Sequence, residues 1–142
     1  MSTIVFAADH AGFALKKHLI AYAEHRGHQA VDAGTHAEAS CDYPDYAHEG
    51  AKQVLAQGGI GIFVCGSGVG ISIAANRHPG IRAVVCSEPF SAEAARRHND
   101  ANVLCMGARV VGVGLAEMIV DAFLRASFEG GRHAARLAKI EL

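Results

Sequence analysis

The chain has 142 residues, of which 51% are hydrophobic and 19% are charged, and its formal net charge at pH 7 is -1. This length and composition predict one folded domain over residues 1–142 and exclude a disordered chain. A net charge near zero provides no broad basic field, so we expect no nucleic-acid partner. We expect no membrane partner either, because no stretch approaches the roughly 20 apolar residues of a membrane-spanning helix.

The cysteines and the first residues both indicate a cytoplasmic protein. The four cysteines form no Cys-x-x-Cys pair, which argues against a zinc site and against a disulfide framework. The opening stretch MSTIVFAADH lacks the basic segment and the long apolar run of a signal peptide.

Short apolar runs alternate with longer helical patterns along the chain. The predicted strands are Thr3–Ala8, Gln29–Ala33, Ile60–Cys65, Ile81–Cys86 and Asn102–Met106. The helices predicted between and after them are Phe13–Arg26, Tyr46–Gln57, Val69–Arg77, Phe90–His98 and Leu115–Ala126. The runs are almost continuously apolar, as in parallel strands buried on both faces. The alternation predicts an α/β fold, namely a three-layer α/β/α Rossmann-like domain with a five-stranded parallel sheet.

Polar residues gather where the predicted strands end. Asp9 and His10 follow the first strand, Cys65 ends the third, and Arg109 comes shortly after the fifth. Ligands of parallel α/β sheets bind beyond the carboxyl ends of the strands, so we expect the functional site at this edge. At the first strand we expect the Asp9 carboxylate to orient the His10 ring.

The segment CGSGVG, from Cys65 to Gly70, follows a strand and opens a helix. Its glycines allow backbone N–H groups to turn toward one point, where the helix N-terminus adds partial positive charge. Such a loop is an anion hole for a phosphate or a reactive oxyanion, or it is only a tight turn. A nucleotide loop fits less well, because Ile71 replaces the P-loop lysine and the glycine spacing is one residue short of G-x-G-x-x-G.

Cys65 lies directly against this loop. The helix N-terminus favours a thiolate there, which suits a nucleophile or a proton acceptor. By contrast, we expect Cys86 and Cys105, which lie in apolar runs, to be packed core cysteines.

Histidines and arginines supply further candidates. His98 ends a predicted helix and is followed by Asn99. Arg132 and Arg136 stand four residues apart on one helix face, either as a phosphate clamp or as a solvated basic face. No His-x-x-x-His or similar spacing supports a metal site, and we expect none.

Six ordered motifs cover essentially the whole chain: ADHAGFALK (8–16), DYPDYA (42–47), CGSGVGISIAANR (65–77), GIRAVVCSEPFSAEAARRHNDANVL (80–104), GARVVG (107–112) and FEGGRH (128–133). With these motifs the sequence resembles the ribose-5-phosphate isomerase B family, the RpiB/LacAB sugar-phosphate isomerases. The resemblance implies an aldose–ketose isomerase that interconverts ribose 5-phosphate and ribulose 5-phosphate through an enediolate, without a cofactor or metal. It also implies a homodimer or tetramer with sites at the subunit interface.

The resemblance implies roles for the catalytic residues. Cys65 is the base that moves the proton between C1 and C2, and His98 opens the furanose ring. In part of the family a glutamate serves as the base, at a position where this chain has Ile71. Isoleucine cannot take a proton, so Cys65 is the expected base in this chain. The loop backbone holds the enediolate oxygen, and its residues are Gly66, Ser67, Gly68, Val69 and Gly70.

Binding roles follow from the same resemblance. The implied sugar contacts are Asp9, His10 and Asn99, with Tyr43 lining the pocket. The implied phosphate ligands are His10, Arg109, Arg132 and Arg136. His98, Asn99 and Arg109 are then expected to come from the neighbouring chain.

Two alternatives remain open. Within the same class, the substrate is allose 6-phosphate, galactose 6-phosphate or a tetrose phosphate. In a different class, the chain is a non-catalytic module that binds a sugar phosphate or a nucleotide. The presence of Cys65, His98 and the arginines argues against the second alternative.

Overall fold

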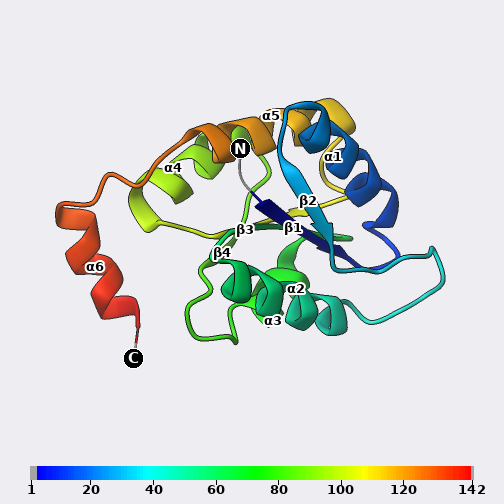
Figure 1. Ribbon diagram of the computed structural model, residues 1–142, viewed down its shortest axis with the longest axis horizontal. Coiled ribbons are helices and arrows are strands. Elements are labelled where there is room, and N and C mark those ends of the chain that lie inside the picture. The colour runs from blue at the N-terminus through cyan, green and yellow to red at the C-terminus, as the bar shows by residue number, and fades with distance from the viewer. Residues whose placement is uncertain (1–2, 142) are drawn as a thin grey trace.

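The structure is a computed structural model that describes residues 3–141. Five strands form one parallel sheet in the order β2-β1-β3-β5-β4 (Figure 1). Their bounds are β1 (Thr3–Ala8), β2 (Gln29–Asp32), β3 (Ile60–Cys65), β4 (Ala83–Val85) and β5 (Val103–Gly107). The three central strands are buried along almost their whole length, which confirms the prediction made from their continuous apolar runs.

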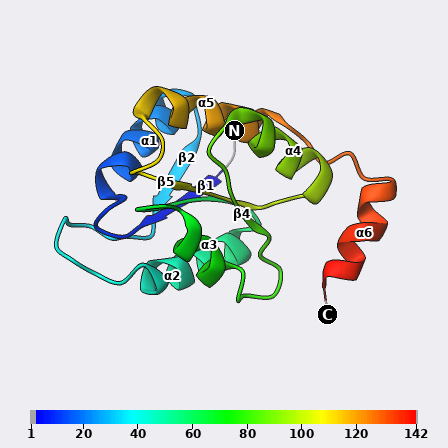
Figure 2. The ribbon, with the colours of Figure 1, turned by 180° about the vertical axis from the view of Figure 1, so that it is seen from behind.

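Helices cover both faces of the sheet (Figures 1 and 2). One face carries α1 (Phe13–His25), α4 (Pro89–Asn99) and α5 (Val113–Arg125), and the other carries α2 (Tyr43–Gln57) and α3 (Val69–Ala75). Alternate residues of β1 separate the core into two layers, because Ile4 and Phe6 pack toward the first set and Val5 and Ala7 toward the second. The predicted three-layer α/β/α fold is therefore confirmed.

The last helix, α6 (Arg132–Ile140), lies beyond α4 and away from the sheet (Figure 1). Most of its side chains are exposed, and His133 is its buried residue. Within residues 3–141, no helix is both long enough and apolar enough to cross a membrane.

Two predicted boundaries differ for physical reasons. We predicted a strand over Ile81–Cys86, but β4 is limited to Ala83–Val85 because side-chain amides satisfy the backbone near its start. Asn76 pairs with both backbone groups of Ala83 at 2.8 Å, and Asn102 Oδ1 accepts the Arg82 N–H at 2.8 Å. Helix α2 begins at Tyr43 rather than Tyr46, since the proline that follows Tyr43 fits the first turn of a helix.

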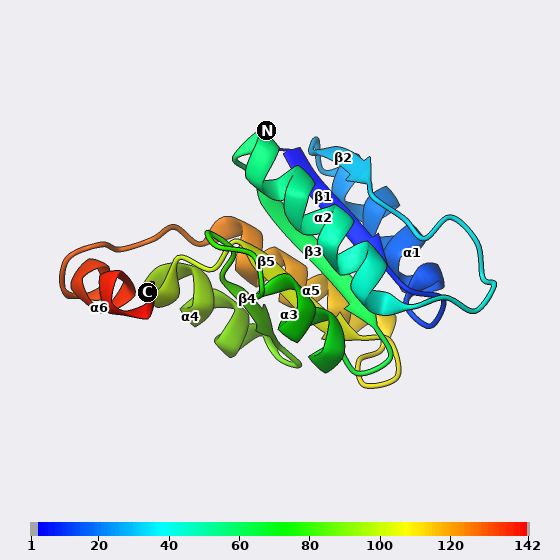
Figure 3. The same ribbon diagram turned by 90° about the horizontal axis from the view of Figure 1, so that it is seen from below.

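The topology creates a crevice at one edge of the sheet. Adjacent strands β1 and β3 are followed by helices on opposite faces, α1 on one and α3 on the other (Figures 1 and 3). The chain therefore leaves the carboxyl ends of these two strands in opposite directions. Ligands of open α/β sheets bind at such a switch point, which lies where the sequence predicts the site.

Candidate active site

The carboxyl ends of β1, β3 and β5 bring the first group of predicted residues together. Cys65 is the last residue of β3 and pairs in register with Gly107, the last residue of β5. The N–H of Asp9 donates to the carbonyl of Val64 at 3.3 Å, so the end of β1 is fastened to the same place. The predicted gathering of polar groups at this edge is confirmed.

The Cys65 thiol is bound into the loop that follows it. Its Sγ accepts a hydrogen bond from the Gly68 N–H at 3.2 Å, and the residue is 4% exposed. Gly68 has a φ of 82°, which places it in the left-handed region that favours glycine. Ser67 is exposed, and its Oγ accepts the Val69 N–H at 3.2 Å. The loop is therefore a turn that directs a backbone N–H at a sulfur atom.

Close packing against the end of β5 fixes this loop. A Cβ on Gly68 would lie 2.7 Å from the Met106 carbonyl carbon, and one on Gly107 would lie 2.6 Å from the Ser67 carbonyl oxygen. Two backbone hydrogen bonds join the segments, from Ala108 N–H to the Cys65 carbonyl at 2.9 Å and from the Arg109 N–H to the Gly66 carbonyl at 3.0 Å. The geometry of the loop thus depends on two glycines that allow two backbone segments to touch.

Arg109 lies beside this loop in its own chain. Its Cδ is 3.8 Å from the position that a Cβ on Gly66 would occupy. We expected Arg109 to come from the neighbouring chain together with His98, but within one chain the two residues lie beyond opposite ends of β5. The reason is that Arg109 directly follows the carboxyl end of β5, whereas His98 precedes the start of that strand.

His10 is oriented by a different group from the one we expected. Its Nδ1 accepts the backbone N–H of Cys41 at 3.2 Å, which leaves the proton of a neutral ring on Nε2. The buried Asp9 carboxylate instead accepts the N–H of Gly12 at 3.1 Å. The expectation that Asp9 orients His10 is therefore wrong, because the turn after β1 uses that carboxylate to cap its own backbone.

Tyr43 reaches the loop from the other side of the crevice. A Cβ on Gly70 would lie 2.6 Å from the Tyr43 ring, so the ring rests on the first turn of α3. The ring is 39% exposed, which leaves part of its surface open to a ligand.

The remaining strand cysteines are in apolar surroundings. Cys86 and Cys105 are buried, as predicted for packed core cysteines. Burial and the nearby Glu88 charge raise the pKa of Cys86 to about 11. Burial also raises the pKa of Cys105 well above its ordinary value. Both thiols are therefore held in the protonated form.

The second group of predicted residues lies at the opposite edge of the sheet. His98 and Asn99 are the last residues of α4, which runs antiparallel to the strands and ends just before β5 begins. The length of β5 alone separates the two edges by roughly 13 Å at 3.3 Å per residue. Within one chain, His98 and Cys65 therefore lie beyond opposite ends of β5.

Arg132 and Arg136 belong to this second group, because α6 lies next to α4 (Figure 3). Both arginines are exposed, as is Arg109 at the other edge. Among residues 3–141, none of these three guanidinium groups takes part in an ion pair within 4.0 Å. All three are therefore free to bind an anion.

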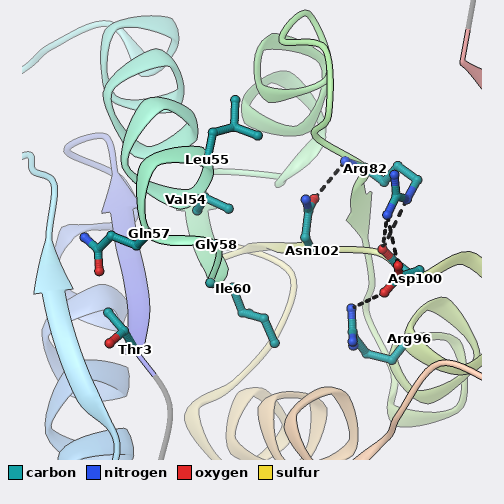
Figure 4. A pocket seen from close by; sticks show the side chains of 11 residues that line it. Thr3, Val54, Leu55, Gln57, Gly58, Ile60, Arg82, Arg96, Asp100 and Asn102 are labelled. Carbon is teal, nitrogen blue, oxygen red and sulfur yellow. Dashed lines mark hydrogen bonds and ion pairs between the residues drawn. The ribbon is translucent and has the colours of Figure 1, made fainter.

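Ion pairs fix the end of α4 (Figure 4). Asp100 has a φ of 45° and stops the helix, and its Oδ1 accepts from Arg96 at 3.1 Å while its Oδ2 accepts from Arg82 at 3.2 Å. These arginines border a cavity of about 490 Å³ at the amino ends of the strands, far from Cys65. Because both guanidinium groups are already paired with Asp100, we expect them to hold the end of α4, with His98 and Asn99, in place.

Two residues near His98 did not emerge from the sequence. Glu129 and His133 approach His98, and the ligand atoms of the three side chains lie within 4.8 Å of one another. Such a set has the chemistry of a metal site. Sequence spacing does not indicate this set, because His98 is 31 residues from Glu129. The Glu-x-x-x-His pattern over residues 129–133 is the one sequence feature that points to it.

The parallel α/β fold and the polar strand ends define a Rossmann-like ligand-binding protein, and comparisons with known proteins narrow this class. The model of the family described as Ribose/Galactose Isomerase matches residues 4–140. "Ribose-5-phosphate isomerase B" of Escherichia coli (strain K12) is 54% identical over 142 residues, which cover 99% of this chain and 95% of that protein.

Solved structures agree with the sequence comparison. A ribose 5-phosphate isomerase of Thermotoga maritima has a TM-score of 0.96 at 46% identity, covering 99% of this chain and 97% of that one. Ribose-5-phosphate isomerase B of Mycoplasma genitalium, solved with bound ribulose-5-phosphate, has a TM-score of 0.93 at 40% identity, covering 97% and 93%. The chain therefore belongs to the Ribose/Galactose Isomerase family, and the prediction of a sugar-phosphate isomerase is confirmed.

Proposed function

We propose that this enzyme interconverts ribose 5-phosphate and ribulose 5-phosphate through an enediolate. The observation that carries the proposal is the Cys65 thiol at the end of β3, bound by the Gly68 N–H at 3.2 Å and flanked by the free Arg109. The names of the relatives support this substrate pair, and the Mycoplasma genitalium structure contains ribulose-5-phosphate.

The central step is proton transfer between C1 and C2 of the open-chain sugar. Cys65 removes the proton from the carbon next to the carbonyl and returns it to the neighbouring carbon. The negative charge that develops on oxygen is stabilised by N–H groups of the loop from Gly66 to Gly70, and one such donor is worth about 3–4 kcal/mol. The exposed Ser67 hydroxyl assists proton movement between the two oxygens.

Ring opening precedes this step when the substrate is a furanose. His98 donates a proton to the ring oxygen, the bond between C1 and that oxygen breaks, and the C1 hydroxyl gives its proton to solvent water to form the aldehyde. Asp9, His10 and Asn99 bind the sugar. The phosphate is held by the Nε2–H of His10 and by the free guanidinium groups of Arg109, Arg132 and Arg136.

Each complete site is built from two copies of the chain. One copy supplies Cys65, His10 and Arg109, and the other supplies His98 and Asn99 together with the arginines of α6. The separation of the two groups within one chain supports this arrangement, because neither group alone provides both a base and a ring-opening acid. We propose a homodimer or tetramer for this reason.

A panel of phosphorylated sugars tests the proposed substrate. We expect the highest kcat/KM with ribose 5-phosphate, compared with allose 6-phosphate, galactose 6-phosphate and erythrose 4-phosphate. The family description includes galactose, so galactose 6-phosphate is the most informative competitor. A higher kcat/KM with that sugar contradicts the pentose assignment, and a lack of turnover with all four sugars contradicts the enzyme itself.

A further inference from the structure

A cluster of three titratable side chains surrounds the residue that we assign to ring opening. His98 comes from the last turn of α4, Glu129 precedes α6, and His133 lies in the first turn of α6. The Oε1 atom of Glu129 is 4.0 Å from His98 Nε2 and 3.6 Å from His133 Nε2. The two imidazole rings stack with their centroids 4.5 Å apart and their planes tilted by 18°.

Arg97 holds Glu129 in this position. Its Nε donates to Glu129 Oε2 at 2.8 Å, its Nη2 lies 2.7 Å from the same oxygen, and the Glu129 N–H donates to the Arg97 carbonyl at 3.0 Å. Oε1 is thereby left to face the histidines. Desolvation raises the pKa of Glu129, but the hydrogen bond and charge of Arg97 outweigh it and lower the pKa below its ordinary value. The group is therefore a carboxylate at neutral pH.

His133 provides a neutral wall for the ring of His98. The residue is 7% exposed, and burial together with the charges of Arg132 and His98 lowers its pKa. Its buried Nε2 has no hydrogen-bond partner among residues 3–141 and points at Glu129 Oε1. An unpaired buried polar atom is unfavourable, so a shorter distance between His133 Nε2 and Glu129 Oε1 would stabilise the cluster.

The surrounding charges favour a carboxylate–imidazole contact over a bound metal ion. Arg97 holds the carboxylate, while Arg132 and Arg136 act electrostatically on His133. Three guanidinium groups near one site oppose a divalent cation.

We propose that Glu129 is a positioning residue for His98, with Arg97 fixing Glu129 and His133 limiting rotation of the His98 ring. A carboxylate that faces Nε2 keeps a proton on that nitrogen and leaves Nδ1 to exchange a proton with the substrate. His98 then gives its Nδ1 proton to the ring oxygen and keeps its Nε2 proton toward Glu129. This inference rests on the proposed function.

The variant Glu129→Gln tests the inference, because it keeps the size of the side chain and removes its charge. Glu117→Gln is the matched control, since Glu117 also faces a histidine, with its Oε2 2.6 Å from His18 Nε2 on α1, and has no assigned role in the site. Two readouts separate ring opening from proton transfer. Turnover of ribose 5-phosphate needs both steps, whereas exchange of the C1 hydrogen of ribulose 5-phosphate in D2O needs the proton transfer by Cys65 and no ring opening. The ketose is open-chain because its C5 oxygen is esterified.

We expect Glu129→Gln to lower kcat/KM for ribose 5-phosphate roughly 10–100-fold, which is less than the loss of a general acid itself would cause. The rate of hydrogen exchange should stay within about threefold of the wild-type rate. Glu129→Asp should recover part of the loss, and Glu117→Gln should change neither readout. Equal losses in both readouts, or no loss in either, would overturn the inference. A wild-type enzyme that shows neither turnover nor exchange would instead contradict the proposed function.

Discussion

Cys65 differs from the other strand cysteines in what its sulfur contacts. A backbone N–H approaches its Sγ at 3.2 Å, and such a donor stabilises negative charge on sulfur. Cys86 and Cys105 receive no comparable help, and burial raises the pKa of both. The three thiols are all buried, so the hydrogen-bond donor rather than exposure distinguishes the proposed base.

Replacing Cys65 with alanine should remove the base and preserve the binding groups. We expect kcat to fall roughly 10²–10⁴-fold while the Kd for ribulose 5-phosphate stays within about threefold, since general-base catalysis has this magnitude. Steady-state kinetics and calorimetric titration measure the two quantities. Cys86→Ala is the control and should retain normal kcat. A Cys65→Ala enzyme with near-normal turnover would show that another group is the base.

Residues adjacent in sequence were easier to predict than residues that meet through the fold. The motif around Cys65 predicted the loop, and the strand ends predicted the place of His10 and Arg109. The partner of His10 was predicted wrongly, because the Cys41 N–H that binds it lies 31 residues away. Glu129 and His133 were missed for the same reason, since only the fold brings them to His98.

At the scale of elements, the loop between β3 and α3 depends on glycine at position 68. A Cβ there would lie 2.7 Å from the Met106 carbonyl carbon, and a φ of 82° adds strain for any L side chain. We expect Gly68→Ala to lower both kcat and the urea midpoint of unfolding, with about 1–3 kcal/mol lost to backbone strain alone.

Gly114→Ala is the control for this prediction. Gly114 lies inside α5, and a Cβ there meets nothing within 4 Å. Gly114 is the second residue of α5, so alanine there should gain at most the roughly 0.5–1 kcal/mol that it gains over glycine in a helix interior. This variant should therefore not lower the midpoint and should leave kcat unchanged. Equal effects of the two substitutions on kcat would mean that the loop geometry does not matter for catalysis.

Apolar periodicity predicted which segments are strands and which are helices, but it did not predict their exact bounds or which polar side chains are buried. The short edge strand β4 depends on the amides of Asn76 and Asn102, whose contacts span long loops. Lys16 gives a second example. It is fully buried and donates to Asp32 Oδ1 and the Thr35 carbonyl, each at 2.5 Å. Nothing in the pair Lys16-Lys17 indicates which lysine is inside.

At the scale of the molecule, histidines make the stability of the fold depend on pH. His78 Nε2 lies 2.7 Å from His48 Nδ1, and burial, His48 and Lys52 lower the pKa of His78 below its ordinary 6.5. Below pH 6.5 the unfolded chain therefore binds a proton at His78 more readily than the folded chain does. The contribution of His78 to stability is complete above 6.5 and is lost as pH falls toward its folded pKa.

We expect the free energy of unfolding to fall as the pH is lowered from about 7 to 5, and to fall less in His78→Asn than in the wild type. Urea unfolding at several pH values measures this dependence. An identical pH dependence in His78→Asn and the wild type would contradict the assignment.

The architecture of the whole molecule was predicted correctly, and it is the reason why we propose a site shared by two chains. Periodicity predicted the parallel sheet and its functional edge. Periodicity could not show that His98, Arg132 and Arg136 lie at the opposite edge of the sheet from Cys65. Their place follows from the direction of α4, which ends just before β5 begins. A single copy therefore carries the two proposed halves of the site at opposite edges of its sheet.

Subunit complementation is the most direct measurement of this shared site. Cys65→Ala and His98→Ala chains, each inactive on ribose 5-phosphate alone, are unfolded and refolded together. In a mixed dimer one site loses both residues and the other keeps both. Random pairing should therefore restore about a quarter of the wild-type activity. A mixture as inactive as either variant alone would show that Cys65 and His98 of different chains do not form one site.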